Sequence, residues 1–130
     1  MLSSNWKFLN SSLLKNADEA DIVLIVGDLS FNGEKKSHEG FLKLLYDLKN
    51  HGKKIYVVTA DHDFKYKDGD TFAFGEKGRY SPERATREEL VGLYSDFGFG
   101  QAIAIDEKHL SYVAQIGDGV RLLALNADFK

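Results

Sequence analysis

The sequence predicts a single α/β domain over residues 1–130, with a βαβ core of parallel strands followed by a C-terminal β-hairpin. Two short apolar runs, "IVLIV" and "KKIYVVTA", flank one amphipathic segment, and two later apolar runs are joined by "GDG". Short apolar runs on either side of a helix are typical of parallel strands, and a Gly-containing turn between two runs is typical of a hairpin.

Composition limits the class of protein. The chain has 130 residues and 43% hydrophobic content, which is enough for one packed core. It has 17 Lys and Arg against 20 Asp and Glu, and the charges are mixed along the chain, so we expect no nucleic-acid-binding surface. The absence of Cys excludes disulfides and thiolate metal sites. No apolar stretch approaches the roughly 20 residues that span a bilayer, and the first residues do not resemble a signal peptide.

The first half of the chain predicts a helix, a strand, a second helix and a second strand, in that order. Residues 3–16 place Trp6, Leu9 and Leu13 at helical spacing. Residues 22–26 are five consecutive aliphatics, which predicts a strand buried on both faces. Residues 37–52 predict a helix that ends at Gly52, and residues 53–60 predict a second strand, parallel to the first and next to it. The predicted apolar face of the second helix consists of Phe41, Leu44, Leu45 and Leu48.

The second half contains one segment with no clear period. Residues 64–84 have three Gly and one Pro, and we expect a long loop there. Residues 86–98 then predict a helix that opens with a capping box between Thr86 and Glu89. The tail predicts two strands, "LSYVAQIG" and "VRLLALN", joined at residues 117–119. The expected apolar face of the helix consists of Leu90, Leu93, Tyr94 and Phe97.

Polar side chains follow both strands of the βαβ unit. Asp28 comes after the first strand, and the run Asp61, His62 and Asp63 comes after the second. Because the carboxyl ends of parallel strands meet at one sheet edge, we expect them in one cleft, near Asn126 and Asp128 from the last strand. Carboxylates, a carboxamide and a His suit a divalent metal, and a shared Asp can bridge two ions for phosphoryl transfer.

Each of these residues also has a structural explanation. A single Asp after a strand is usually a turn former or a helix cap, and that is the favoured interpretation of Asp28 taken alone. A lone His62 is more often a hydrogen-bonded surface residue than a catalyst. We interpret His38, His51 and His109 as structural or solvated.

The motifs "GDLSFNGE" and "TADHD" resemble those of the calcineurin-like metallophosphoesterases, and nearly the whole chain is similar to a bacterial subgroup of these phosphohydrolases. The resemblance implies an α/β sandwich that hydrolyses phosphomonoester or phosphodiester substrates with two divalent ions of the Mn, Fe or Zn class. It implies that Asp28 is the bridging metal ligand and that Asp61 replaces the metal-binding Asn. It also implies that His62 faces the phosphate, that Asp63 orients His62, and that Ala60 replaces a Gly.

The chain departs from the family at both ends. It lacks the Asp-x-His strand and the later His motifs that complete the two metal sites, so we expect a partial domain that holds no metal firmly and is inactive alone. The alternative is a degenerate, non-catalytic binding or scaffold module. An HD-type phosphohydrolase is a third hypothesis, which requires its His-Asp pair on a helix. A partial sheet exposes its edges and an apolar face, so we also expect self-association.

Overall fold

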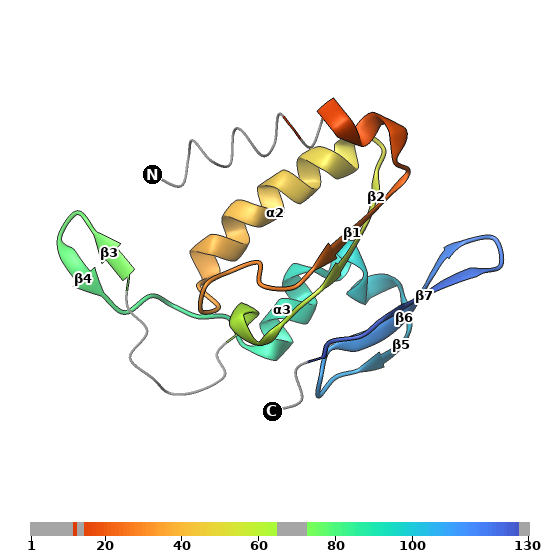
Figure 1. Cartoon of the computed structure of the whole chain (residues 1–130). Helices are drawn as coiled ribbons and strands as arrows, with labels where there is room; N and C mark the ends of the chain where they lie inside the picture. The colour runs from red at the N-terminus through yellow and green to blue at the C-terminus, as the bar shows by residue number, and fades with distance from the viewer. Residues whose placement is uncertain (1–11, 13–14, 65–72, 128–130) are drawn as a thin grey trace.

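The computed structural model describes residues 12, 15–64 and 73–127, which form a mixed α/β fold (Figure 1). The described residues contain a parallel strand pair, a short hairpin and a three-stranded antiparallel sheet. The helices and strands are β1 (Ile22–Val26), α2 (Lys35–Asn50), β2 (Lys54–Val58), β3 (Ala73–Gly75), β4 (Gly78–Tyr80), α3 (Arg87–Leu93), β5 (Ala102–Asp106), β6 (Ser111–Gly117) and β7 (Val120–Ala124). The 3-10 turns are η1 (Ala17–Glu19), η2 (Asp61–Asp63), η3 (Ser95–Phe97) and η4 (Phe99–Gln101).

The predicted βαβ unit is confirmed. β1 and β2 are parallel and in register from Ile22 opposite Lys54 to Val26 opposite Val58. α2 connects them and buries the predicted apolar face, while Gly52 follows it with a φ of 83°. A glycine adopts this left-handed conformation without strain, which explains why the helix ends here.

One face of β1 differs from the prediction. Val23 and Ile25 are partly buried and pack against the core, whereas Leu24 is 54% exposed and Val26 is 80% exposed. Successive side chains of a strand point to opposite faces, so one face of β1 is covered and the other is open. The prediction of burial on both faces is therefore wrong, because a continuous aliphatic run does not specify which neighbours cover it.

The predicted capping box of α3 is confirmed. The Glu89 N–H donates to Oγ1 of Thr86 (3.2 Å), and the Thr86 N–H donates to Oε2 of Glu89 (2.9 Å). α3 ends at Leu93, earlier than predicted, and the chain continues through η3 to Gly98, whose φ is 126°. A side chain at position 98 would collide with the ring of Tyr112, so the close packing of this turn on β6 also requires a glycine.

The C-terminal hairpin is confirmed and belongs to a larger sheet. β6 and β7 are antiparallel and are joined through Asp118 and Gly119. β5 pairs with the other edge of β6 and was not predicted. Its sequence, "AIAID", contains two Ala, which are weak strand formers, so the segment has no clear strand signal in the sequence. The Tyr112 hydroxyl donates to the Val57 carbonyl (2.9 Å) and so links this sheet to β2.

Two other predictions concern segments that lie partly outside the described residues. The prediction of an unstructured loop over residues 64–84 is wrong in part, because β3 and β4 form a hairpin that projects away from the rest of the fold (Figure 1). Two short strands around one turn give too little sequence for a period to be detected. The helix predicted over residues 3–16 lies mostly outside the described residues.

The core lies where α2, β2, α3 and β6 meet. No helix among the described residues is both long and apolar enough to cross a membrane. The most deeply buried apolar side chains are Leu45, Leu48, Val57, Leu90, Tyr94, Phe97, Leu110 and Tyr112.

Candidate functional site

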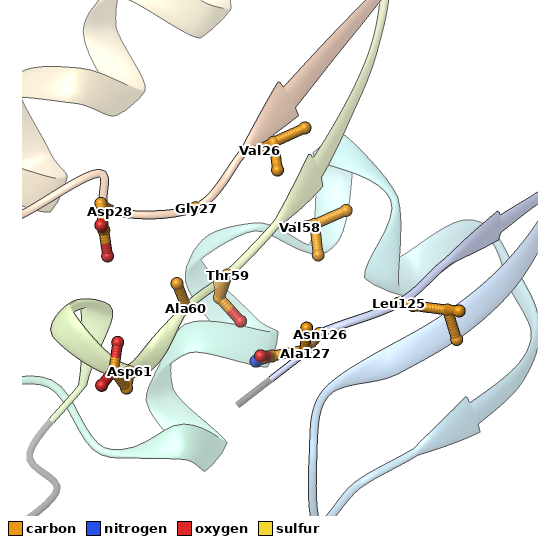
Figure 2. A pocket seen from close by; sticks show the side chains of 10 residues that line it. All are labelled: Val26, Gly27, Asp28, Val58, Thr59, Ala60, Asp61, Leu125, Asn126 and Ala127. Carbon is orange, nitrogen blue, oxygen red and sulfur yellow. The ribbon is translucent and has the colours of Figure 1, made fainter. Parts of the chain in front are cut away.

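The ends of β1 and β2 form one side of a cavity. Their last residues, Val26 and Val58, are register partners, and the Gly27 N–H continues the ladder by donating to the Val58 carbonyl (2.7 Å). The segments that follow the two strands therefore begin at the same level. A cavity of about 530 Å³ opens at this edge (Figure 2), which is where ligands bind in open α/β sheets.

Oxygen-bearing side chains from three segments line the cavity. Asp28 follows β1, Asp61 follows β2, and Asn126 follows β7. Figure 2 shows the Asp28 and Asp61 carboxylates directed into the space between the first two segments. Asp28 is exposed, Asp61 is half-buried and Asn126 is 8% exposed. The structure thus brings these three residues to one place, as the strand order predicts, while Asp128 lies outside the described residues.

The backbone between β1 and Asp28 turns sharply. Gly27 and Asp28 have φ values of 49° and 54°, so two consecutive residues are left-handed. Asp is one of the few side chains that tolerate this conformation. A Cβ atom at position 27 would lie 2.7 Å from that of Ala60, so the two loops approach as closely as one methyl group allows. Ala60 itself is extended, with a φ of −129°, and its side chain is therefore unstrained.

Asp63 joins the two loops that follow β1 and β2. Its side chain is fully buried, and its carboxylate accepts the Ser30 N–H at Oδ1 and the Ala60 N–H at Oδ2, both at 2.9 Å. Burial raises the pKa of Asp63, and hydrogen bonds from the backbone of Ala60, Ser30 and Leu29 oppose that rise. Asp63 thus holds the ends of β1 and β2 together.

His62 is oriented by a main-chain group rather than by Asp63. It is exposed, it is not among the residues that line the cavity, and its Nδ1 lies 2.8 Å from the Phe31 carbonyl. Because a carbonyl oxygen only accepts, Nδ1 carries a proton and donates to Phe31, and Nε2 does not take part in this contact. The Phe31 ring stacks on the imidazole, with centroids 6.4 Å apart. The expected role of Asp63 in orienting His62 is taken by Phe31.

The His-Asp pair follows a strand and lies in η2, a 3-10 turn. An HD-type site requires this pair within a helix, so the local structure does not favour that hypothesis. His51 is exposed and His109 is half-buried, and both are hydrogen-bonded close to their own positions, as expected for structural or solvated residues.

Three further residues lie beside the site. His38, interpreted from the sequence as structural or solvated, is fully buried and hydrogen-bonded to Tyr94 and Asp63, and it has helical spacing from Phe41 and Leu45 on one face of α2. Ser30 donates from its hydroxyl to the His62 carbonyl (2.7 Å). Thr59 lines the cavity, and its buried hydroxyl has no hydrogen-bond partner among the described residues. No sequence signal identifies Ser30 or Thr59.

The oxygen ligands at the cavity suit a divalent metal in kind but fall short in number. Two carboxylates and one carboxamide are hard donors of the type that Mn²⁺ prefers. Within residues 15–64 and 73–127, no group of three or more His, Cys, Asp or Glu is arranged to hold a metal ion.

A comparison with models of known protein families and with curated protein sequences finds no match to this chain.

Proposed function

We propose that this chain contributes one side of a two-metal phosphoester hydrolase site. The observation that carries the proposal is that Asp28 and Asp61 line a single cavity at the carboxyl end of a parallel strand pair. The resemblance of "GDLSFNGE" and "TADHD" to metallophosphoesterase motifs supports it. Bound ions of the Mn, Fe or Zn class would activate a water molecule and neutralise charge on the phosphoryl group.

In this proposal each residue has a distinct task. Asp28, exposed at a left-handed turn, and Asp61, on the opposite loop, would hold the ions. His62 is fixed through Nδ1 by Phe31, which leaves Nε2 to contact a phosphate oxygen. Asp63 holds the two loops at a constant separation through its backbone hydrogen bonds.

The remaining metal ligands come, under this proposal, from outside the described residues. Two carboxylates and one carboxamide do not fill the spheres of two ions, each of which takes about six ligands when bound by oxygen. The chain alone is therefore expected to bind metal weakly and to hydrolyse nothing at a measurable rate. The fold of the complete domain would be the α/β sandwich of the similar family.

A non-catalytic binding or scaffold module is the second candidate. Two observations favour it: the similar family has Asn where this chain has Asp61, and no cluster of three metal-binding side chains occurs in the described part of the chain. An extra carboxylate beside Asp28 adds negative charge that an empty site must tolerate.

Two measurements separate the candidates. The first is the coding sequence on either side of residues 1–130: an Asp-x-His motif before it and a Gly-His-x-His motif after it are expected for the hydrolase, and their absence supports the scaffold. The second is Mn²⁺ titration of the chain by calorimetry. Weak binding that Asp28→Asn abolishes is expected, with Asp118→Asn, an exposed Asp in the β6–β7 turn, as the control. Equal binding by Asp28→Asn and the unmodified chain would exclude Asp28 as a ligand.

We also propose that the chain associates with copies of itself through its open apolar surface. The exposed face of β1 carries Leu24 and Val26, and Leu123 and Leu125, on and just after β7, are 61% and 64% exposed. Exposed apolar side chains in a sheet favour association because burial removes them from water.

A further inference from the structure

A buried imidazole links α3 to the turn that carries Asp61 and His62. His38 lies in the first half of α2 and is fully buried. Its Nδ1 is 2.7 Å from the Tyr94 hydroxyl at the end of α3, and its Nε2 is 2.7 Å from the Asp63 carbonyl in η2. The two rings are nearly perpendicular, with centroids 5.6 Å apart. Three segments that are distant in sequence therefore meet at one side chain.

The partners of His38 determine its tautomer. The Asp63 carbonyl can only accept, so Nε2 carries the proton and donates. Burial lowers the pKa of His38, which keeps the ring neutral, and Nδ1 is then an acceptor for the Tyr94 hydroxyl. Both ring nitrogens are satisfied, and the direction of each hydrogen bond is fixed.

Several hydrogen bonds hold the η2 turn, and His38 supplies one that comes from α2. The Asp63 carboxylate accepts from the backbone of Ala60 and Ser30, the Ser30 hydroxyl donates to the His62 carbonyl, and the His62 imidazole donates to the Phe31 carbonyl. These contacts join the turn to the loops after β1 and β2. The hydrogen bond from His38 to the Asp63 carbonyl anchors the turn to the packed helices.

We infer that His38 is a positioning residue: hydrogen-bonded to Tyr94, it fixes the η2 turn and so sets the position of Asp61 at the cavity and of His62 next to Asp61. His38 is not among the cavity-lining residues and acts only through the Asp63 main chain. The identity of the ligand at the turn rests on the proposed function. The hydrogen bonds from His38 to Tyr94 and Asp63 do not depend on it.

A residue that only fills space would not need this arrangement. Burying an imidazole is costly unless its polar atoms are paired, and the neighbouring buried positions of α2 are apolar. A space-filling role predicts that an apolar side chain of similar size serves equally well at position 38. A positioning role predicts that the donor at Nε2 is required, and that Gln, which keeps a donor at a comparable distance, restores part of the effect.

Nitrogen-15 NMR of the full chain without metal tests the linkage directly. His38 is expected in the Nε2–H form, and Tyr94→Phe is expected to make the Nδ1–H form detectable. The Ala60 and Ser30 amides both donate to the Asp63 carboxylate, so their rates of hydrogen exchange report how firmly the turn is held. Relative to the Tyr112 amide in β6, this exchange is expected to accelerate roughly tenfold in His38→Leu, and less in His38→Gln.

Matched controls separate a local effect from a general loss of stability. Tyr112→Phe removes another buried hydroxyl, and His51→Gln removes an exposed imidazole from the end of α2. Neither is expected to change the His38 tautomer or the relative exchange of Ala60. If His38→Leu does not fold, Tyr94→Phe still tests the proposal through the tautomer and the same two amides.

An Nδ1–H tautomer in the unmodified chain, or unchanged relative exchange at Ala60 and Ser30 in the folded variants, would overturn the inference. Mn²⁺ titration is performed separately. If the NMR results are as expected and the chain nevertheless binds no Mn²⁺, the positioning role of His38 is supported and the proposed metal site is refuted.

Discussion

The buried carboxylate of Asp63 accepts a hydrogen bond from the Ser30 N–H at 2.9 Å, and this contact joins the segment after β1 to the turn after β2. The other oxygen of the same carboxylate accepts the Ala60 N–H at 2.9 Å. Two strand ends that are far apart in sequence therefore share one anchor, and one of its partners, Ala60, lines the same cavity as Asp28 and Asp61.

Asp63→Asn is expected to lower the free energy of unfolding by about 2 kcal/mol. An amide has one acceptor oxygen, so either the Ser30 or the Ala60 N–H would face an NH₂ group and lose its partner. Urea denaturation followed by circular dichroism measures the change. Asp118→Asn, in the exposed β6–β7 turn, is the control and is expected to change stability by less than about 0.5 kcal/mol. Equal effects of the two substitutions would contradict the role of Asp63.

Two glycines are expected to respond to alanine in opposite directions. Gly33 has a φ of 77°, and a Cβ there would lie 2.8 Å from the Phe64 backbone, so Gly33→Ala is expected to destabilise the fold by at least about 1–2 kcal/mol. Gly40 lies within α2 and a Cβ there meets nothing within 4 Å, so Gly40→Ala is expected to stabilise it by up to about 1 kcal/mol. Thermal unfolding of both variants measures the difference, and a stabilising Gly33→Ala would show that the loop adopts another conformation.

The stability that His38 contributes is expected to depend on pH. Burial lowers the pKa of His38 below its ordinary value of 6.5, so in moderately acidic solution the unfolded chain binds a proton that the folded chain does not. The contribution is therefore complete above that value and is lost as the pH falls toward the lowered pKa. Asp63 has the opposite effect on the pH dependence of stability. Its raised pKa means that the folded chain takes up a proton more readily than the unfolded chain as the pH falls.

Comparison with His38→Gln isolates the histidine, since Asp63 is present in both proteins. The difference in unfolding free energy between the unmodified chain and this variant is expected to shrink as the pH falls from about 7.5 to about 5. Denaturation at several pH values measures it, and His51→Gln controls for loss of an exposed imidazole from the same helix. A difference that grows in acid would mean that His38 is charged in the folded state.

The proposed association through β1 is expected to depend on concentration. Sedimentation equilibrium should give an average mass above that of the monomer, and the double substitution Leu24→Thr and Val26→Thr should lower it, because Thr keeps the strand preference and removes apolar surface. Val120→Thr is the control, since Val120 is also exposed (52%) but lies beside the β6–β7 turn. A monomeric unmodified chain at all concentrations would refute the association.

The chain alone is expected to show negligible turnover of p-nitrophenyl phosphate or its bis ester in the presence of Mn²⁺. The described residues supply too few ligands to assemble two metal ions at the cavity. Release of p-nitrophenol, measured by absorbance, provides the test. Robust turnover that Asp28→Asn abolishes would show that the chain completes its own metal site.

The sequence was informative where local chemistry determines structure. The capping box between Thr86 and Glu89 and the turn at Asp118 depend on neighbouring residues, and both were predicted. The meeting of Asp28 with Asp61 followed from one rule about parallel strands.

Features set by tertiary contacts were not predicted. The exposure of Val26 depends on what packs against β1, and β5 was hidden by its Ala content. His38 has the helical spacing of a core residue, but its pairing with Tyr94 and Asp63 depends on three segments that no local pattern relates.

The contact between Gly27 and Ala60 has an evolutionary consequence. The space between the two loops holds one methyl group, and Ala60 supplies it from an ordinary extended backbone. Position 60 can therefore exchange Ala and Gly freely, whereas position 27 is restricted to Gly by both its left-handed φ and its neighbour. Divergent relatives should vary at the second motif and remain invariant at the first glycine, so position 27 is the more dependable marker for recognising them.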